Sequence, residues 1–457
     1  MQRFNELTIR CKMSVVVTKK ENTVPPLVII DPEVSEEYPT ALAARIVSKF
    51  ELPLPVEAYD FPEKGNINQH TFLIQAGTDD PPSEYLLQRI NQQVFARPDR
   101  VMAAVVACLE AQAEGLRKHP QGKDIDWETI TLIPTKTGEP YLVSENRRSI
   151  TFWRLMVKIP ECRTYKSLGE IEQREKQIFV AEEAGRGLAV FGDLTSNMDI
   201  SQLENPLPGY RDTRVYYDQL QSVLAGHRTL EEAAPLLPSD PVVRNSTEQH
   251  FLVHSPEEKY RKRKEDPELQ HFIELALENR EYALTLLRAM EEGRIRTVAI
   301  HGDTKLDNFL FSTTNGLAKA LVDLDTIMPH SWLADWGDMV RSLSNLAGEK
   351  ETNLLNVQVD TEIFNALARG FLTTAQKVTQ EEIVLMVDAV KILALELGVR
   401  FLADFLRGDS YFGLGPTDLP DLNKRRAMVQ LTLFERLQEK APQLHETVEQ
   451  LWKHHQV

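Results

Sequence analysis

The segment at residues 297–325 constrains the fold most, because a strand-forming pattern there interrupts a half of the chain that is otherwise helical. Apolar runs at 309–311 and 317–322 flank Asn315-Gly316, and an Asn-Gly pair between two such runs is typical of a hairpin turn. The segment also places four polar side chains in or next to turns: Asp303, Asn308, Asp323 and Asp325. We therefore expect a carboxylate and an amide from one loop to face one or two carboxylates at the end of a neighbouring strand.

These side chains suit phosphoryl transfer. That reaction needs a carboxylate that accepts the proton of the attacking hydroxyl, and oxygen ligands for a Mg²⁺ ion that bridges the nucleotide phosphates. The kinase catalytic loop has the form H-R-D-x-x-x-x-N, and residues 301–308, HGDTKLDN, have its His, Asp and Asn at the same spacing. We expect Asp303 to be the catalytic base and Asn308 and Asp323 to hold the metal. Asp325 is either a further metal ligand or a neighbour of one.

Residues next to this motif have more than one interpretation. Lys305 is expected to offset charge on the transferred phosphoryl group. His301 is expected to hold the loop by hydrogen bonds, because Asp303 already serves as the base. Asp335 and Asp338 lie near a predicted helix start, which favours capping or bracing of the catalytic loop.

The composition excludes several classes of protein. The chain has 457 residues, with 52 Lys and Arg against 68 Asp and Glu, and a net charge of −16. Such a field repels phosphate backbones and anionic lipids, so neither nucleic acid nor a membrane is expected as a partner. The 3 cysteines are widely spaced, which excludes a disulfide framework and favours a reducing cytoplasm. No apolar stretch reaches the roughly 20 residues of a membrane span.

The pattern of the chain predicts three parts. Residues 1–37 are interpreted as a loosely ordered leader, and residues 160–457 as a mainly helical lobe in which 383–406 is apolar nearly all round, as in a buried helix. The part between them, 38–159, combines two expected helices, at 41–50 and 97–116, with β-like runs at 71–75, 85–90, 130–134, 140–143 and 149–159. The prediction is an α+β protein with a small strand-rich lobe followed by a large helical lobe.

The motif HGDxxxxN followed by VDLD resembles that of the aminoglycoside phosphotransferase and choline kinase superfamily, and within it the N-acetylhexosamine 1-kinases. The likeness covers most of the chain, through EYLLQRINQQVF (84–95), EAGRGLAVFGDL (183–194), PLPGYRDT (206–213), HGDTKLDNFLF (301–311), ALVDLDTIMP (320–329), ADWGDMVR (334–341) and ELGVRFLADFLRGDSYF (396–412). It implies a protein-kinase-like two-lobed fold with an antiparallel-sheet N-terminal lobe, and ATP and Mg²⁺ as cofactors. The 1-kinases often have Asn in place of Gly302 and Phe-His in place of Tyr210-Arg211.

The resemblance also implies where the nucleotide binds. Gly65 and Asn66, just before the run at 71–75, take the place of the glycine-rich phosphate loop, with an ordinary surface turn as the alternative. The likeness to LQ(K/R)IN places Arg89, or else Gln88, where kinases have their phosphate-pairing lysine. Adenine is expected against the connection that follows residue 159.

Two further sets of residues complete the expected site. The acidic partner of Arg89 is expected on the helix at 97–116, as Glu110 or Glu114. Tyr210, Asp212 and Trp332 are candidate contacts of the acceptor, although large aromatic residues more often pack in a core.

The expected function is that of an ATP- and Mg²⁺-dependent kinase. Its acceptor would be a sugar or amino-sugar hydroxyl, with an N-acetylhexosamine phosphorylated at the anomeric position as the favoured case on resemblance. An aminoglycoside or amino-alcohol phosphotransferase is one alternative, which the negative net charge suits. A nucleotide-binding regulatory pseudokinase is another, because the usual lysine is missing. A monomer is the default.

Overall fold

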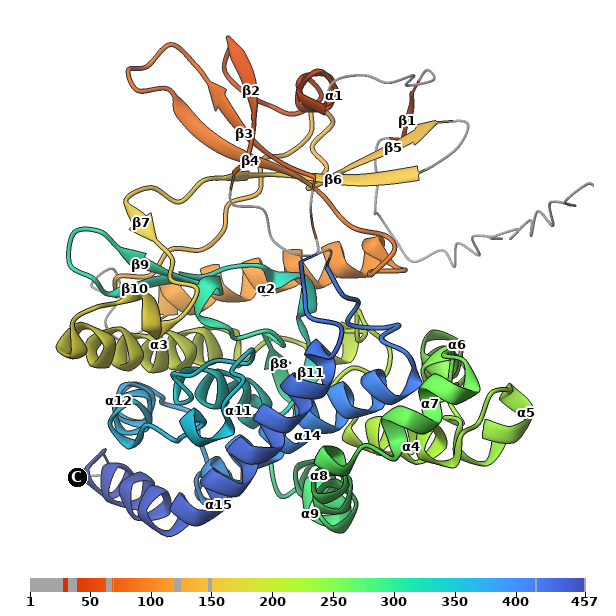
Figure 1. The fold of residues 1–457 in the computed structure, drawn as a ribbon. Coiled ribbons are helices and arrows are strands. Elements are labelled where there is room, and N and C mark those ends of the chain that lie inside the picture. The colour runs from red at the N-terminus through yellow and green to blue at the C-terminus, as the bar shows by residue number, and fades with distance from the viewer. Residues whose placement is uncertain are drawn as a thin grey trace, which may run out of the picture.

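The structure is a computed structural model that describes residues 28–31, 39–62, 68, 70–118, 125–146, 150–415 and 417–455. A twisted sheet forms an upper lobe, and helices form a larger lower lobe (Figure 1). This arrangement confirms the predicted α+β, protein-kinase-like fold. Gly65 and Asn66, the predicted phosphate-loop residues, lie outside the described residues.

Six strands form the sheet of the N-terminal lobe, in the spatial order β1-β5-β6-β4-β3-β2. Their bounds are Val28–Asp31 for β1, Val56–Asp60 for β2, Thr71–Ala76 for β3, Ser83–Arg89 for β4, Leu142–Asn146 for β5 and Ile150–Val157 for β6. Neighbouring strands are antiparallel, except that β1 and β5 are parallel. The predicted runs at 71–75 and 85–90 are the hairpin β3–β4. Strand β1 lies in the segment expected to be a leader, so part of that segment belongs to the sheet.

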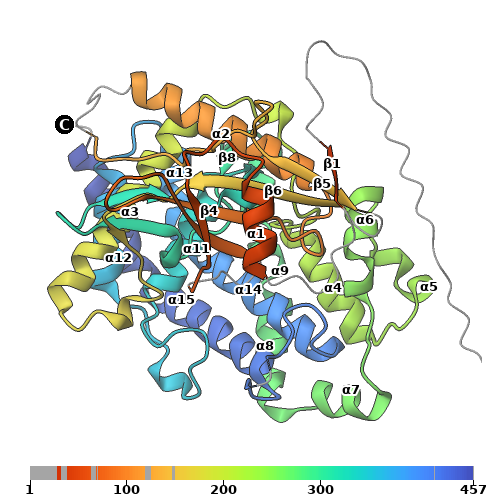
Figure 2. The same cartoon turned by 90° about the horizontal axis from the view of Figure 1, so that it is seen from above.

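The two faces of this sheet have different surroundings. Helix α1 (Pro39–Val47) lies across one face (Figure 2), where Leu87, Trp153 and Leu155 belong to its apolar core. Successive residues of a strand point to opposite faces. Gln88 and Arg154, which are opposite each other in the pairing of β4 with β6, therefore lie on the other face, toward the helical lobe.

Helix α2 (Pro98–Lys118) corresponds to the helix predicted at 97–116 and packs against α3 (Arg174–Thr195). It lies beneath the sheet (Figure 1). Its buried residues recur at helical spacing, so one face of the helix turns inward. They are Pro98, Val101, Met102, Ala104, Val105, Cys108 and Gln112.

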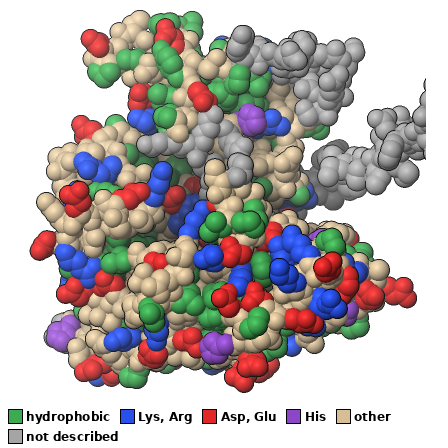
Figure 3. Space-filling view, viewed as in Figure 1, with side chains coloured by type: hydrophobic (Ala, Val, Ile, Leu, Met, Phe, Trp, Pro, Cys, Tyr) green, Lys and Arg blue, Asp and Glu red, His purple; other side chains and the backbone are tan. Residues whose placement is uncertain are grey.

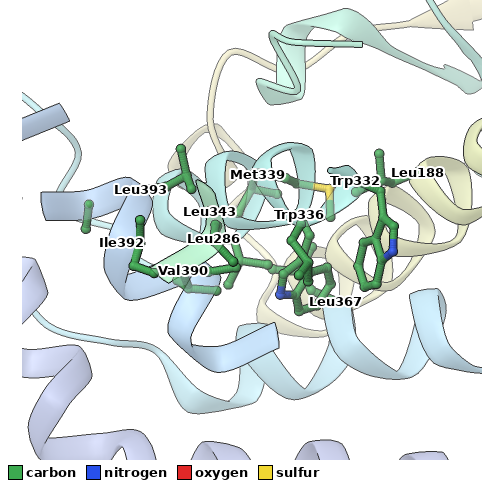
Figure 4. Packing of buried hydrophobic residues seen from close by; sticks show 14 of the residues in the cluster. Leu188, Leu286, Trp332, Trp336, Met339, Leu343, Leu367, Val390, Ile392 and Leu393 are labelled. Atoms are coloured by element: carbon green, nitrogen blue, oxygen red, sulfur yellow. The ribbon is translucent and has the colours of Figure 1, made fainter. Parts of the chain in front are cut away.

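The core of the C-terminal lobe is built by long helices that surround α14 (Met386–Arg407), which corresponds to the buried helix predicted at 383–406. Figure 4 shows side chains of this core, among them Trp336, Leu367 and Val390. The other long helices are α11 (Trp332–Leu343), α12 (Thr361–Leu372) and α15 (Leu422–His455). Shorter helices are α4 (Thr213–Ala225), α5 (Leu230–Ala233), α6 (Pro241–Thr247), α7 (Glu257–Lys264), α8 (Pro267–Glu278), α9 (Arg280–Ala283), α10 (Thr285–Glu291) and α13 (Gln380–Val384). No helix in the described ranges is both long and apolar enough to cross a membrane.

Two small sheets interrupt the helices where the sequence predicts strands. Strand β8 (Val298–Ile300) pairs with β11 (Met328–His330). Strand β9 (Phe309–Ser312) pairs with β10 (Ala318–Leu321) and with β7 (Cys162–Arg163), which confirms the predicted hairpin. The loop that follows β8 and the loop that follows β10 therefore lie side by side, and the Val322 amide donates to the Asn308 carbonyl at 2.9 Å.

Candidate active site

The loop that follows β8 is held by hydrogen bonds to a buried carboxylate near the start of α11. Asp335 accepts hydrogen bonds from the backbone amides of His301 at 2.7 Å and Gly302 at 2.8 Å. The Thr304 hydroxyl donates to the Asp335 carbonyl at 2.7 Å. Burial raises the pKa of this carboxyl, although the two amides act in the opposite direction. Asp335 thus braces the loop, which was one of the roles expected for it.

His301 and Gly302 shape the turn that leads to the predicted base. The His301 ring is buried and its Nε2 lies 2.8 Å from the carbonyl oxygen of Val322, which ties the two loops together as expected. Gly302 has a φ of +85°, and a Cβ at that position would lie 2.6 Å from the carbonyl oxygen of Thr326. A side chain is therefore excluded there by both backbone conformation and space.

Asp303, Lys305 and Asn308 converge at the mouth of this loop. The Asn308 amide donates to the Asp303 carbonyl at 2.8 Å and to its carboxylate at 3.3 Å. The Lys305 ammonium lies 3.1 Å from the same carboxylate, and the Asp303 side chain is 29% exposed. Burial opposes the charge of Lys305, but the carboxylates around it, Asp303 first, raise its pKa. A partly exposed carboxylate beside a fixed cation can accept a proton from a substrate hydroxyl.

The loop that follows β10 brings two further carboxylates to the same place. Asp323 adopts a left-handed backbone conformation with a φ of 64°. Burial and the neighbouring Asp325 carboxylate raise the pKa of Asp323 to about 6. Both oxygens of Asp325 are engaged by the N-terminal lobe: Oδ2 accepts from the Asn68 amide at 2.7 Å, and Oδ1 pairs with Arg154. Of the two carboxylates, Asp323 is therefore the better candidate to bind a metal ion.

The donors present fit a hard divalent cation. Within the part of the chain that the structure describes, no three His, Cys, Asp or Glu side chains converge as a metal site. A buried carboxylate, Asp323, and an amide, Asn308, remain as oxygen donors. Mg²⁺ is usually held by only one or two protein carboxylates and completes its shell with phosphate oxygens and water. The residues present fit such an ion better than zinc or another metal that needs nitrogen or sulfur ligands.

A second group of residues braces the loop that follows β8 through the carbonyl of Gly302. The Tyr210 hydroxyl and the Arg211 guanidinium both donate to the Gly302 carbonyl, at 3.0 and 3.1 Å. Arg211 also donates to Asp338 at 2.8 Å. Burial would raise the pKa of Asp338, but the guanidinium groups of Arg341 and Arg211 lower it to about 2. The positions at which the chain differs from the 1-kinases, 302 and 210–211, are thus in contact.

Sequence reasoning missed Arg400, which lies beside Tyr210. Its guanidinium carbon is 4.7 Å from the ring centre of Tyr216, 5.2 Å from that of Tyr210 and 5.7 Å from that of Tyr411. No carboxylate in the described ranges lies within ion-pair distance of it, and its closest polar contact is the Tyr411 hydroxyl at 3.4 Å. Residues 396–412 are one of the stretches that resemble the 1-kinases, and an arginine stands among apolar residues there. That pattern could have indicated Arg400 from the sequence.

Two of the predicted acceptor contacts have structural roles. Asp212 caps α4, since its carboxylate accepts from the Arg214 amide at 3.0 Å, and burial raises its pKa. Trp332 stacks on Phe371 with ring centres 4.8 Å apart and is 8% exposed, inside the helical core (Figure 4). Its place at the start of an amphipathic helix that packs on α12 explains why it turns inward rather than toward an acceptor.

The predicted pair of Arg89 with a helix glutamate is not seen in the described residues. Arg89 is opposite Trp153 in the pairing of β4 with β6, so it lies on the face that α1 covers, and burial lowers its pKa. Glu110 and Glu114 are exposed because the inward face of α2 runs through Val105, Cys108 and Gln112. Arg154, which sequence reasoning did not select, faces the catalytic loops instead.

The fold and this arrangement of residues define a protein-kinase-like phosphotransferase that acts on hydroxyl groups of small molecules. Residues 180–360 match the model of the phosphotransferase enzyme family. The segment that contains the HGDxxxxN motif thus matches that family, and the predicted resemblance to the superfamily is confirmed.

Solved structures of related fold include a microcompartment-associated aminopropanol kinase, which is 12% identical with a TM-score of 0.51 and covers 89% of this chain and 98% of its own. An amicoumacin kinase in complex with AMP-PNP, Ca²⁺ and Ami is 10% identical, with a TM-score of 0.47 and coverage of 86% and 93%. An ethanolamine kinase from Plasmodium vivax is 11% identical, with a TM-score of 0.43 and coverage of 84% and 83%. At such identities the likeness describes the fold alone.

Proposed function

We propose that the protein is an ATP- and Mg²⁺-dependent kinase that transfers the γ-phosphoryl group to a hydroxyl of a sugar, with an N-acetylhexosamine phosphorylated at the anomeric position as the favoured acceptor. The observation that supports the kinase is the convergence of Asp303, Lys305 and Asn308 beside Asp323. The preference for the N-acetylhexosamine rests on the sequence resemblance.

Each of these residues has its own role in the proposed reaction. The Asp303 carboxylate accepts the acceptor's hydroxyl proton while that oxygen attacks the γ-phosphorus and ADP leaves. Lys305 lies within reach of Asp303 and offsets negative charge that develops on the phosphoryl group. Asn308 and Asp323 would hold Mg²⁺, which neutralises charge on the nucleotide phosphates when it is bound.

Arg400 supports a neutral acceptor over a cationic one. Sites for ammonium ligands offer open aromatic faces to the cation. Here the faces of Tyr210, Tyr216 and Tyr411 are already occupied by the protein's own guanidinium, and a second positive charge beside it would be repelled. Hydroxyl and amide oxygens of a sugar accept hydrogen bonds from a guanidinium. The net charge of −16 favours an aminoglycoside or amino alcohol, which is therefore the second candidate.

The test is ADP production by the purified protein with ATP and Mg²⁺, across N-acetylhexosamines, hexoses, aminoglycosides and amino alcohols. We expect turnover with a neutral sugar, and an Asp303→Asn variant is expected to lose about 10²–10⁴-fold in kcat because the proton acceptor is removed. ATP affinity should stay nearly unchanged.

Unaltered turnover by Asp303→Asn would contradict the assignment of the base. Turnover with amino alcohols alone would replace the sugar by the second candidate. ATP binding without transfer to any acceptor would support a regulatory pseudokinase.

A further inference from the structure

Arg154 is a buried charge that the proposed chemistry does not use. It lies in the middle of β6, and its side chain is 3% exposed. Its Nε donates to the Gln88 side-chain oxygen at 3.0 Å, and its Nη1 pairs with Asp325. A guanidinium is costly to bury unless several partners hold it, so a position this deep indicates a specific role.

Protein kinases pair the nucleotide phosphates with a lysine of the sheet, which a glutamate on the following helix holds in place. Among the residues that the structure describes, neither group stands at that place. Gln88, which is neutral, lies on the cleft face of β4, and Arg89 lies on the face that α1 covers. The candidate glutamates of α2, Glu110 and Glu114, are exposed.

The contacts of Asp325 place the guanidinium of Arg154 between the sheet and the helical lobe. Asp325 follows Asp323 by two residues and also accepts from Asn68, which lies just before β3. The Asn68 side-chain oxygen in turn accepts from the backbone amide of Asn91, just after β4. Arg154 therefore lies where the strands of the sheet meet the loop that carries Asp323. In the space-filling view the molecule is hollowed between the two lobes, and Lys or Arg side chains lie at the hollow (Figure 3).

We infer that Arg154 is the phosphate-pairing cation of the nucleotide site, oriented by Gln88 and held by Asp325 in place of the usual lysine and helix glutamate. The inference rests on the proposed function. A guanidinium carries five N–H donors. In Arg154, Nε and Nη2 each donate one hydrogen bond to Gln88 and Nη1 donates one to Asp325, which leaves two N–H groups for phosphate oxygens. The acidic partner comes from the catalytic lobe and not from α2, so the pair joins the two lobes across the nucleotide site.

The test measures binding of ATP and of adenosine by calorimetry in EDTA, so that no metal contributes. We expect Arg154→Gln to weaken ATP at least about tenfold, as for the loss of hydrogen bonds to a charged group, and to leave adenosine within about twofold. Arg154→Lys should retain part of the ATP affinity. The Arg89→Gln variant tests the other cation of the sheet, which lies on β4. The Lys136→Gln variant removes one positive charge from an exposed position of the same lobe and is the matched control. Both should bind ATP within about twofold of the unaltered protein.

A double variant separates phosphate pairing from neutralisation of Asp325. Arg154→Gln with Asp325→Asn removes both buried charges, which relieves the unpaired carboxylate that the single variant leaves. Its ATP affinity should remain low while its melting temperature recovers. If ATP affinity recovers as well, Arg154 only neutralises Asp325, and the inference is overturned.

The remaining outcomes separate this inference from the proposed function. If Arg154→Gln binds ATP as the unaltered protein does, or if Arg89→Gln shows the loss, the inference fails while acceptor-dependent turnover by the unaltered protein still stands. If the unaltered protein binds no ATP at all, both are overturned.

Discussion

At the scale of single residues, the candidate site depends on groups that hold its loop by hydrogen bonds to the loop backbone. The proposed base, Asp303, is positioned by hydrogen bonds to the two residues before it. Asp335 binds their amides, and Tyr210 and Arg211 bind the Gly302 carbonyl. Because the backbone amides of His301 and Gly302 and the carbonyl of Gly302 all have hydrogen-bond partners, the loop is held in one conformation before a substrate binds. The reaction then requires less rearrangement of the loop.

Gly302 provides a test of this preorganisation. Gly302→Ala should lower both stability and kcat, because its Cβ would lie 2.6 Å from a backbone oxygen of Thr326. We expect a loss of about 1–3 kcal/mol in the free energy of unfolding, measured by chemical denaturation. Gly138→Ala is the matched control: its φ of +87° is nearly the same, and a Cβ there would meet nothing within 4 Å. Equal losses in the two variants would contradict a role for the close contact.

At the scale of elements, the C-terminal end of α14 is built around buried charge. Asp404 accepts from Arg407 Nε and from the backbone amides of Tyr411 and Phe412, each at 2.9 Å. The ring of His250 meets the edge of Tyr411, with ring centres 4.9 Å apart. Burial first, and then Arg407, lower the pKa of His250 to about 3, although Asp404 acts in the opposite direction.

This environment predicts a loss of stability in acid. The unfolded chain protonates His250 near its ordinary pKa of 6.5, whereas the folded chain keeps it neutral down to about 3. The unfolded state therefore binds the extra proton as the pH falls below 6.5, and at pH 5 the folded state loses about 2 kcal/mol. The loss is absent above pH 7 and complete below about pH 3.

The measurement is the free energy of unfolding at pH 7 and pH 5 for the unaltered protein and for His250→Phe, which keeps a ring against Tyr411. The difference between the two pH values should shrink by about 2 kcal/mol in the variant. His454→Phe, at an exposed position of α15, should leave that difference in place. An unchanged difference in His250→Phe would show that this histidine is protonated in the folded protein.

At the scale of the whole molecule, the upper sheet and the helices have separate hydrophobic cores. The core on the sheet is small and is formed by α1, the strands β3 to β6 and nearby residues, whereas the larger core spans most of the helices, α2 included. Buried polar contacts, Arg154 and Asn68 with Asp325, join the two lobes. A small core with few buried apolar residues opens more easily than a large one.

Nucleotide binding is therefore expected to stabilise the N-terminal lobe in particular. At an ATP concentration about 100 times the Kd, binding to the folded state alone adds about 2.7 kcal/mol. Hydrogen exchange should show the largest slowing in β3, β4 and β6, because these strands would face the nucleotide at the proposed site. Adenosine at the same saturation is the control for phosphate contacts. Slowing confined to the helical lobe would contradict a site between the lobes.

Much of the fold and part of the site could be predicted from the sequence, because the signals are local. The Asn-Gly turn and its flanking apolar runs specify the hairpin β9–β10, and the spacing of Asp303 and Asn308 lies within one loop. The helical period of apolar residues located α2 and α14. The sequence resemblance placed the phosphotransferase segment correctly.

Other features were decided only by tertiary structure, because they depend on contacts between distant segments. Whether Arg89 or Gln88 faces the cleft follows from the register of β4 against β6, which a single-residue slip would invert. Arg154 and Asp325 are 171 residues apart, so no local pattern indicates their pairing. Trp332 turns into the core because α12 packs on its helix. The sequence by itself determined many of the elements and the spacing of Asp303 and Asn308 within one loop, whereas packing determined which side chains meet around that loop.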